Sequence, residues 1–288
     1  FRNYWPELGL TQEQFLELGR SPSEPGWNMT ALALRLSGRR NAVSRRHGVV
    51  SRRMWAKLWP GLPEEEVPIS HVTNGVHLAT WVHQELAWTY ARHLGDNWWE
   101  KQDDSAIWSK VAAIPDEELW RVHLKNKEEL LKILRNRARG RWIAGQAEPS
   151  QVLIQGALLD PAALTIGFAR RFAGYKRATL ILRDHDRLKK LLLNPWRPVQ
   201  LIFAGKAHPA DDGGKALIQA VYHLAKDPAF GGRIVFVEDY DMHVARYFVQ
   251  GCDLWLNNPL APLEACGTSG EKAAVNGVPS LSVLDGWW

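Results

Sequence analysis

Short apolar runs alternate with longer amphipathic segments over the second half of the chain. Each run is rich in Val, Ile, Leu or Phe and is short enough for a buried strand, and each intervening segment suits a helix. Strand, helix and strand at this spacing predict right-handed βαβ units and an α/β fold with a parallel sheet covered on both faces. The predicted strands are Leu164–Ala169, Val199–Ala204, Arg233–Val237, Asp253–Leu256 and Pro279–Leu284, and the predicted helices are Ala178–Leu193, Lys215–Ala225, His243–Gln250 and Glu271–Asn276.

The first half of the chain has a different pattern. Residues Thr89–Gly140 are predominantly helical in character, and Pro115 followed by three acidic residues is a good start for one long helix. Residues Phe1–Ser70 combine a helical segment, Met29–Leu36, with Gly, Pro and Ser breaks at Ser21–Gly26. We interpret this part as the end of a domain that begins before Phe1.

Length and composition indicate a packed, non-membrane protein of about two domains. The chain has 288 residues, of which 45% are hydrophobic and 23% charged, which excludes wholesale disorder. It has neither a membrane-length apolar run nor a signal peptide, so a cytoplasmic location is expected. Two cysteines, Cys252 and Cys266, form no spaced metal-binding framework, and we expect reduced thiols and no metal.

The net charge of +5 does not by itself predict a nucleic-acid partner. The basic clusters, such as Arg39-Arg40 and Arg52-Arg53, are short and interrupted. We therefore expect no nucleic-acid or membrane partner, while small anions such as phosphate remain candidate ligands.

The segment after the first predicted strand carries several cations. Arg171 and Lys176 are five positions apart, on a loop and at its far end, so both can reach one anion. The pattern suits a phosphate-binding loop, although a solvated basic turn is an equally good interpretation of these residues alone.

The run Pro262–Lys272 is the most informative part of the sequence. Gly267, Thr268, Ser269 and Gly270 lead into a predicted helix and offer backbone N–H groups and hydroxyls to a phosphate. Glu264 is a candidate acceptor for sugar hydroxyls. Cys266 lacks the partners of a nucleophile and is interpreted as a small packed residue. Lys272, taken alone, is better interpreted as a surface charge.

Six motifs occur together in an order and spacing that resemble a known family. They are Asn41–Gly48, Val72–His77, Arg171–Arg177, Gly205–Pro209, Tyr240–Leu256 and Glu264–Gly277. Together they resemble the α-glucan (glycogen, starch, maltodextrin) phosphorylases, especially the short bacterial and archaeal type. The resemblance spans most of residues 40–288.

The resemblance implies a two-lobed glycosyltransferase fold of the GT-B type, with Rossmann-like parallel sheets. Residues 1–88 would end the N-terminal lobe, 89–145 would connect the lobes, and 146–288 would form most of the C-terminal lobe. It further implies pyridoxal 5′-phosphate as cofactor, α-1,4-glucan and inorganic phosphate as substrates, glucose 1-phosphate as product, and a possible homo-oligomer. The cofactor's phosphate group would serve as proton donor and acceptor.

The family's site residues map onto positions of this chain. Lys272 resembles the lysine that binds the cofactor, and Lys272 also stands where sugar-nucleotide transferases carry a second glutamate. The remaining assignments are Thr268, Ser269, Arg170 and Tyr240 for the cofactor's phosphate, Arg171 and Lys176 for substrate phosphate and catalysis, and His47, Glu264, Ala265, Cys266 and Gly267 for the glucosyl unit.

The chain departs from the family pattern at several positions. Glu271 and Arg46 replace apolar residues, Cys266 replaces a serine, and Gly174 replaces a larger residue. The family's glycine-rich loop and its final helices would lie outside residues 1–288. We therefore expect a fragment with weak or no activity, and we keep two alternatives: a sugar-nucleotide-dependent glucan synthase, or an inactive glucan- or phosphate-binding module.

Overall fold

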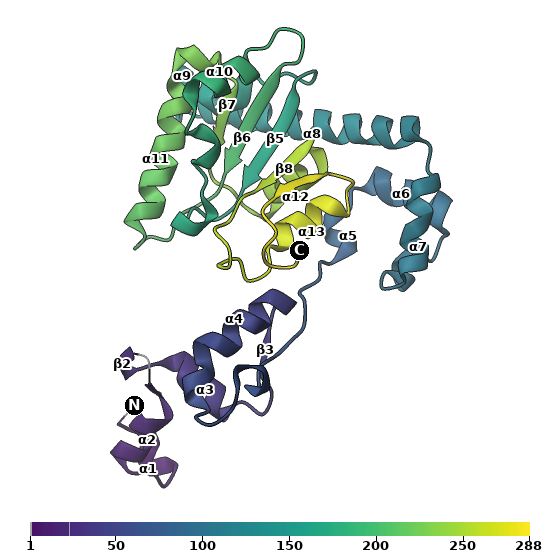
Figure 1. The fold of residues 1–288 in the computed structure, drawn as a ribbon. Helices are drawn as coiled ribbons and strands as arrows, with labels where there is room; N and C mark the ends of the chain where they lie inside the picture. The colour runs from purple at the N-terminus through teal and green to yellow at the C-terminus, as the bar shows by residue number, and fades with distance from the viewer. Residues whose placement is uncertain (1, 23) are drawn as a thin grey trace. The chain divides into compact units, whose positions relative to one another are not determined.

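A computed structural model of the chain describes residues 2–22 and 24–288 (Figure 1). The residues form two compact units. The small unit comprises Phe1–Asn74, Pro262–Gly267 and Asp285–Trp288, and the sheet unit comprises Gly75–Ala261 and Thr268–Leu284. The lobe boundaries implied by the family resemblance, at residues 88 and 145, stay a prediction.

The sheet unit is built around five parallel strands in the order β7-β6-β5-β8-β9 (Figure 1). The α/β fold class with a parallel sheet is therefore confirmed. In chain order, β6 pairs with β5 and β7 pairs with β6 on the far side from β5. The next strand, β8, then pairs with the other side of β5. In such sheets ligands bind at the carboxyl ends of the strands, near this change of direction. The strands are β5 (Leu164–Ala169), β6 (Val199–Ala204), β7 (Ile234–Val237), β8 (Leu254–Asn257) and β9 (Ser280–Ser282).

Both faces of the sheet are buried, as the unbroken apolar runs predict. In β6, Ile202 belongs to one apolar cluster and its neighbours Leu201 and Phe203 belong to another on the opposite face. The first cluster includes residues of α8 (Asp116–Ile143) and α12 (Met242–Gly251), and the second includes residues of α10 (His185–Leu192) and α11 (Asp212–Lys226).

Local sequence explains where most of these helices begin. Asp211 and Asp241 accept backbone N–H bonds at the starts of α11 and α12. The predicted helix over Ala178–Leu193 is wrong in its first half, because α10 begins only after its own cap, Asp184. Two short 3₁₀ turns, η6 (Gly174–Lys176) and η7 (Leu180–Leu182), come before it. The predicted helix near Glu271 is α13, which spans Thr268–Ala274.

The long helix predicted after Pro115 is present as α8, with 28 residues. It packs against α12 so closely that a Cβ on Gly251 would lie 2.5 Å from the carbonyl oxygen of Asn126. Only glycine fits this contact. The part of the chain before α8 forms several short helical elements instead of one continuous helix. They are α5 (Leu78–Trp81), α6 (Gln84–Leu94), η3 (Trp98–Lys101), α7 (Ser105–Ser109) and η4 (Lys110–Ala113).

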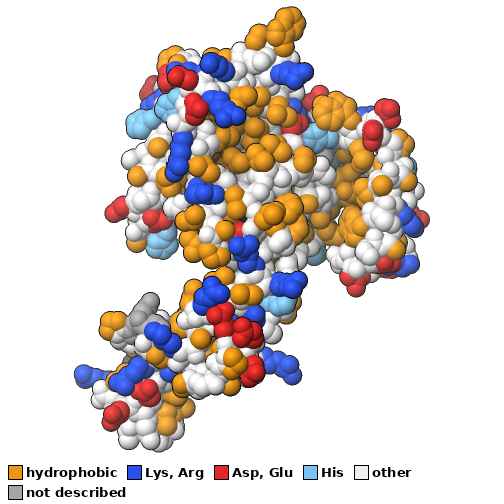
Figure 2. Space-filling model, viewed as in Figure 1, with side chains coloured by type: hydrophobic (Ala, Val, Ile, Leu, Met, Phe, Trp, Pro, Cys, Tyr) orange, Lys and Arg blue, Asp and Glu red, His pale blue; other side chains and the backbone are white. Residues whose placement is uncertain are grey.

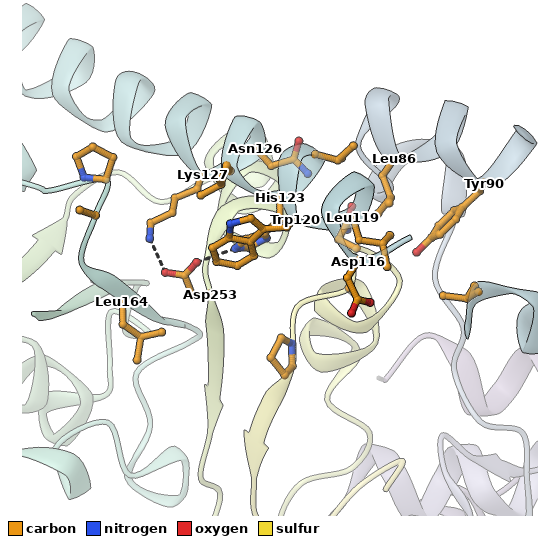
Figure 3. Close-up of a pocket in the computed structure, with 18 residues that line it drawn as sticks. Leu86, Tyr90, Asp116, Leu119, Trp120, His123, Asn126, Lys127, Leu164 and Asp253 are labelled. Atoms are coloured by element: carbon orange, nitrogen blue, oxygen red, sulfur yellow. Dashed lines mark hydrogen bonds and ion pairs between the residues drawn. The ribbon is translucent and has the colours of Figure 1, made fainter. Parts of the chain in front are cut away.

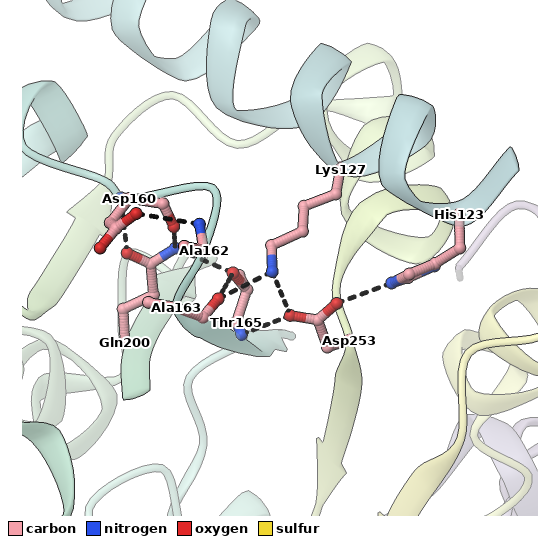
Figure 4. A network of polar contacts seen from close by, with 8 residues as sticks. All are labelled: His123, Lys127, Asp160, Ala162, Ala163, Thr165, Gln200 and Asp253. Atoms are coloured by element: carbon pink, nitrogen blue, oxygen red, sulfur yellow. Dashed lines mark hydrogen bonds and ion pairs between the residues drawn. The ribbon is translucent and has the colours of Figure 1, made fainter. Parts of the chain in front are cut away.

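A buried polar network also ties α8 to the sheet (Figure 4). The carboxylate of Asp253, just before β8, accepts bonds from Lys127 Nζ at 2.6 Å, from His123 Nε2 at 2.7 Å and from the backbone N–H of Thr165 at 2.7 Å. Burial acts to raise the pKa of Asp253, but these three donors hold it below its ordinary value. The network therefore favours an ionised carboxylate in a mostly apolar environment.

The small unit contains short elements around a minor core of Ala42, Val67 and Ile69. Its strands β3 and β4 are parallel, whereas β1 and β2 form an antiparallel pair at the predicted Gly, Pro and Ser break.

Among the residues of both units that the structure describes, no helix combines the length and apolar character needed to cross a bilayer. The small unit's elements are α1 (Tyr4–Glu7), α2 (Gln12–Leu18), β1 (Arg20–Ser21), β2 (Glu24–Trp27), α3 (Met29–Leu36), β3 (Asn41–Ala42), α4 (Arg45–Trp55), η1 (Ala56–Leu58), η2 (Glu64–Glu66) and β4 (Ser70–His71), and the sheet unit further contains α9 (Pro149–Val152), the π-helical η5 (Leu153–Ala157) and η8 (Pro228–Phe230).

Candidate functional site

Two basic side chains lie just beyond the carboxyl end of β5. Arg170 is buried, and its backbone N–H donates to the carbonyl of Ala204 at 3.1 Å, which continues the pairing of β5 with β6. Gly205 follows with φ +147°, and a Cβ there would lie 1.9 Å from the carbonyl oxygen of Arg170. Glycine at position 205 is therefore needed for this close approach of two loops. Arg171, the next residue, is exposed.

Lys176 is buried rather than solvated, which argues against the interpretation of its loop as a plain basic turn. Its Nζ lies 4.8 Å from the ring centre of Tyr175. Arg177 adopts a left-handed conformation with φ +50° and donates from Nε to the carbonyl of Asn258 at 2.8 Å. The Arg171–Lys176 loop is thus fastened to the loop after β8. That Arg171 and Lys176 converge on one anion stays a prediction.

Tyr240 follows β7 and lies near Arg170. Its hydroxyl donates to the carbonyl of Ala169 at 3.5 Å, directly before Arg170. Burial raises the pKa of Tyr240 far above its ordinary value, with a further contribution from Asp241, while the positive charge of Arg170 acts in the opposite direction. The structure therefore brings together two of the residues assigned to the cofactor's phosphate.

Lys272 lies on α13 with its side chain against an indole ring. Its Nζ is 4.1 Å from the ring centre of Trp81, which is buried. Burial lowers the pKa of Lys272, and the nearby Glu271 acts to raise it. Trp81, Tyr240 and the neighbour Ala273 belong to or pack against one apolar cluster of the sheet unit. A half-buried lysine with a lowered pKa is a better nucleophile than a surface lysine.

Thr268 and Ser269 begin α13, one turn before Lys272. The Oγ of Ser269 is buried and has no hydrogen-bond partner among the residues that the structure describes. Buried hydroxyls are normally satisfied, so this oxygen is available to a ligand.

The small unit holds the residues assigned to the glucosyl unit. The Oγ of Ser44 donates to the carbonyl of Ala265 at 2.7 Å and accepts from the backbone N–H of His47 at 3.1 Å. This hydroxyl joins the Glu264–Gly267 segment to the start of α4, on which His47 lies. Burial lowers the pKa of His47, so its ring is more often neutral at pH 7. The Nδ1 of the ring accepts from the backbone N–H of Val43 at 3.2 Å.

Asp285 anchors the same segment. Its Oδ2 accepts from the backbone N–H of Glu264 at 2.9 Å, and its Oδ1 lies 3.0 Å from Nε of Arg46. Arg46, a departure from the family pattern, therefore has a structural partner. Cys266 is buried, in agreement with its interpretation as a packed residue. Glu264 is also buried.

The sheet unit has a cavity of about 770 Å³ at the opposite edge of its sheet (Figure 3). Leu164, Asp253 and Pro279 line it, and these stand at the amino ends of β5, β8 and β9. Trp120 and Leu119 of α8 also line the cavity (Figure 3). None of the assigned site residues lines this cavity.

Comparison with known proteins agrees with the motif analysis. Residues 16–287 match the Carbohydrate phosphorylase family. The chain belongs to this family. The resemblance to phosphorylases is therefore confirmed.

Curated relatives match nearly the whole chain. It is 53% identical over 282 residues to a glycogen phosphorylase of Aquifex aeolicus (strain VF5). The matched region covers 97% of this chain and 40% of the relative. A maltodextrin phosphorylase of Thermococcus litoralis is 48% identical over 281 residues, with coverage of 97% and 33%. A glycogen phosphorylase of Mycobacterium tuberculosis (strain H37Rv) is 46% identical over 280 residues, with coverage of 97% and 32%. The chain thus spans about a third of the length of these relatives.

Sequence analysis missed four residues that shape this site. Arg177 and Asp285 hold loops in place through hydrogen bonds. Trp81 contacts the amine of Lys272, and Asn276 bonds its backbone carbonyl. Trp81 lies shortly after the Val72–His77 motif, and this closeness in sequence could have indicated that Trp81 belongs to the site.

Proposed function

We propose that this chain carries the cofactor and phosphate side of an α-glucan phosphorylase. The reaction is transfer of a terminal α-1,4-linked glucosyl unit to inorganic phosphate, with retention, to give glucose 1-phosphate. Membership of the carbohydrate phosphorylase family supports the reaction class. The observation that carries the proposal is the position of Lys272, half-buried against Trp81 with a lowered pKa.

The residues around Lys272 fit pyridoxal phosphate. Lys272 supplies an amine whose pKa is lowered by burial, which favours the neutral form that attack on an aldehyde requires. Ser269 supplies a buried hydroxyl without a partner among the described residues, and Thr268 is next to it. When bound, the cofactor would supply a phosphate group that donates and accepts a proton. Arg170 and Tyr240, which lie together beyond β5 and β7, would hold that phosphate.

Arg171 and Lys176 would hold the substrate phosphate. Arg171 is exposed and free to rotate onto an incoming anion, whereas Lys176 is buried within a fastened loop. Two cations beside the cofactor's phosphate would offset the repulsion between two phosphate groups. Both side chains would stabilise the negative charge that develops when phosphate replaces the leaving sugar.

The glucosyl unit would be bound by the small unit. Buried Glu264 would accept sugar hydroxyls, and His47, with a lowered pKa, would hydrogen-bond a hydroxyl as a neutral ring. Cys266 and Gly267 would line the same segment together with Ala265. We extend the proposal to a two-lobed GT-B fold, a cytoplasmic location and a homo-oligomer, with no nucleic-acid or membrane partner.

Basic side chains form small separate groups on the face that Figure 2 shows. A long polyanion is best held by a continuous basic strip, whereas separate groups suit small anions. The separation of the basic groups supports the proposed preference for phosphate over nucleic acid.

The alternatives make different binding predictions. A sugar-nucleotide-dependent synthase would bind UDP-glucose or ADP-glucose, and an inactive module would bind glucan or phosphate without pyridoxal phosphate. Calorimetry of the purified chain with each compound tests the proposal: we expect pyridoxal phosphate and inorganic phosphate to bind and the sugar nucleotides not to bind. Binding of a sugar nucleotide without pyridoxal phosphate would favour the synthase instead.

A further inference from the structure

Asn276 is a buried amide with three hydrogen bonds to backbone groups in different segments. Its Nδ2 donates to the carbonyl of Trp81 at 2.8 Å and to the carbonyl of Lys272 at 2.8 Å. Its Oδ1 accepts from the backbone N–H of His83 at 2.9 Å. Asn276 is only 4% exposed. One side chain therefore connects the helix that carries Lys272 to the segment that carries Trp81.

Trp81 is held at its backbone from two sides. The carbonyl that accepts from Asn276 also accepts from Nε2 of Gln250, on α12, at 3.0 Å. Gln250 is 3% exposed and Trp81 is 9% exposed. Loss of Asn276 would leave the carbonyl of Trp81 with Gln250 alone and would remove the side-chain link between that segment and the carbonyl of Lys272. The indole is thus fixed relative to α13 by groups that do not touch the lysine amine.

We propose that Asn276 is a positioning residue, which holds the indole of Trp81 against the amine of Lys272. This inference rests on the proposed function, in which Lys272 is the reactive amine. Asn276 acts through Trp81 and touches only the backbone of Lys272. Its role is to keep the amine in one place and partly shielded from water.

The indole acts on the amine in two opposite ways. Its face attracts an ammonium group, which favours the charged form. Its bulk excludes water, which favours the neutral form. Burial is the larger influence on Lys272, and Glu271 on the same helix acts against it. Loss of the indole should therefore make Lys272 behave more like an ordinary surface lysine.

Competitive labelling with trace acetic anhydride at a series of pH values tests this inference on the purified chain. Peptide mass mapping gives the labelling midpoint of Lys272 itself, with the exposed lysines Lys206 and Lys215 as internal references. The variants are Asn276→Ala, Trp81→Leu and the double variant. We expect each single change to raise the midpoint of Lys272 toward that of the exposed reference lysines. The double variant should show no further shift, because both changes remove the same contact.

Gln200 provides a matched control. It is another fully buried amide with three hydrogen bonds, to the N–H and carbonyl of Asp160 and to the hydroxyl of Thr165. Gln200→Ala should lower thermal stability by a similar amount and leave the Lys272 midpoint unchanged. If Asn276→Ala does not fold, Asn276→Ser, which keeps one donor, takes its place.

Three outcomes would overturn the inference. These are a wild-type midpoint in the Asn276 variant, additive shifts in the double variant, or an equal shift in Gln200→Ala. Labelling uses no pyridoxal phosphate, so it is independent of cofactor binding. Failure of Lys272 to bind the cofactor would overturn the proposed function and leave the positioning result intact.

Discussion

Arg46 and Asp285 form an ion pair, with 3.0 Å between Nε and Oδ1, although they stand near opposite ends of the sequence. The Asp285 side chain is fully buried, whereas that of Arg46 is 46% exposed. The pair fixes the segment that carries Glu264, because Asp285 also accepts the backbone N–H of that residue.

Arg46→Leu restores the apolar character usual in the family and leaves the Asp285 carboxylate without its cation. We expect the free energy of unfolding to fall by about 1–3 kcal/mol, since a buried charge-assisted contact is lost. Urea unfolding measures it. The double variant with Asp285→Asn should lose less than Arg46→Leu alone, and a double variant that loses more would contradict this explanation.

The Asp253 network predicts a loss of stability in acid. The folded-state pKa of Asp253 is lower than its ordinary value of 3.8, so its contribution is fully present above that value. The contribution disappears as the pH falls from 3.8 through the lowered folded-state pKa. Asp253→Asn should therefore be less stable than wild type at pH 7, and the difference should shrink in strong acid.

Denaturant titrations at neutral and acid pH measure this difference. An Asp253→Asn variant with an unchanged or growing deficit in acid would show that the carboxylate charge does not stabilise the contact between α8 and the sheet.

Exposed Arg171 is predicted to bind phosphate and to contribute little to folding. Arg171→Ala should weaken inorganic phosphate binding by about 10- to 150-fold, equivalent to the loss of one charge-assisted contact. Its melting temperature should stay near that of wild type. Arg183, in the following turn, offers a control of the same residue type. Equal losses of binding and stability in Arg171→Ala would favour a structural role.

The 288-residue chain by itself should release little or no glucose 1-phosphate from maltodextrin and phosphate. It covers only 40% of the Aquifex aeolicus relative, and positioning of both reactants contributes several kcal/mol to such reactions. A coupled assay for glucose 1-phosphate, with pyridoxal phosphate present, makes the measurement. Turnover comparable to that of an intact family member would show that these residues form a complete active site.

Local patterns predicted the sheet well because a strand buried on both faces, such as β6, appears in the sequence as a contiguous apolar run. The break before α10 coincides with its local cap, Asp184, and follows the left-handed Arg177, which donates to the carbonyl of Asn258 in the loop after β8. The contact of Arg177 is tertiary and could not be predicted from the local pattern. The partners of Lys272 were missed for the same reason, since Trp81 is brought to it by tertiary packing. Motif order gave the family, whereas single residues left several interpretations open.

Borohydride trapping tests the central claim, that Lys272 is the amine for pyridoxal phosphate. The purified chain is incubated with the cofactor, reduced and mapped by peptide mass, with Lys272→Arg as the control that keeps the charge. We predict an adduct concentrated on Lys272 in wild type and absent from that peptide in the variant. An adduct spread evenly over exposed lysines such as Lys206 and Lys215, with none preferred at Lys272, would contradict the account.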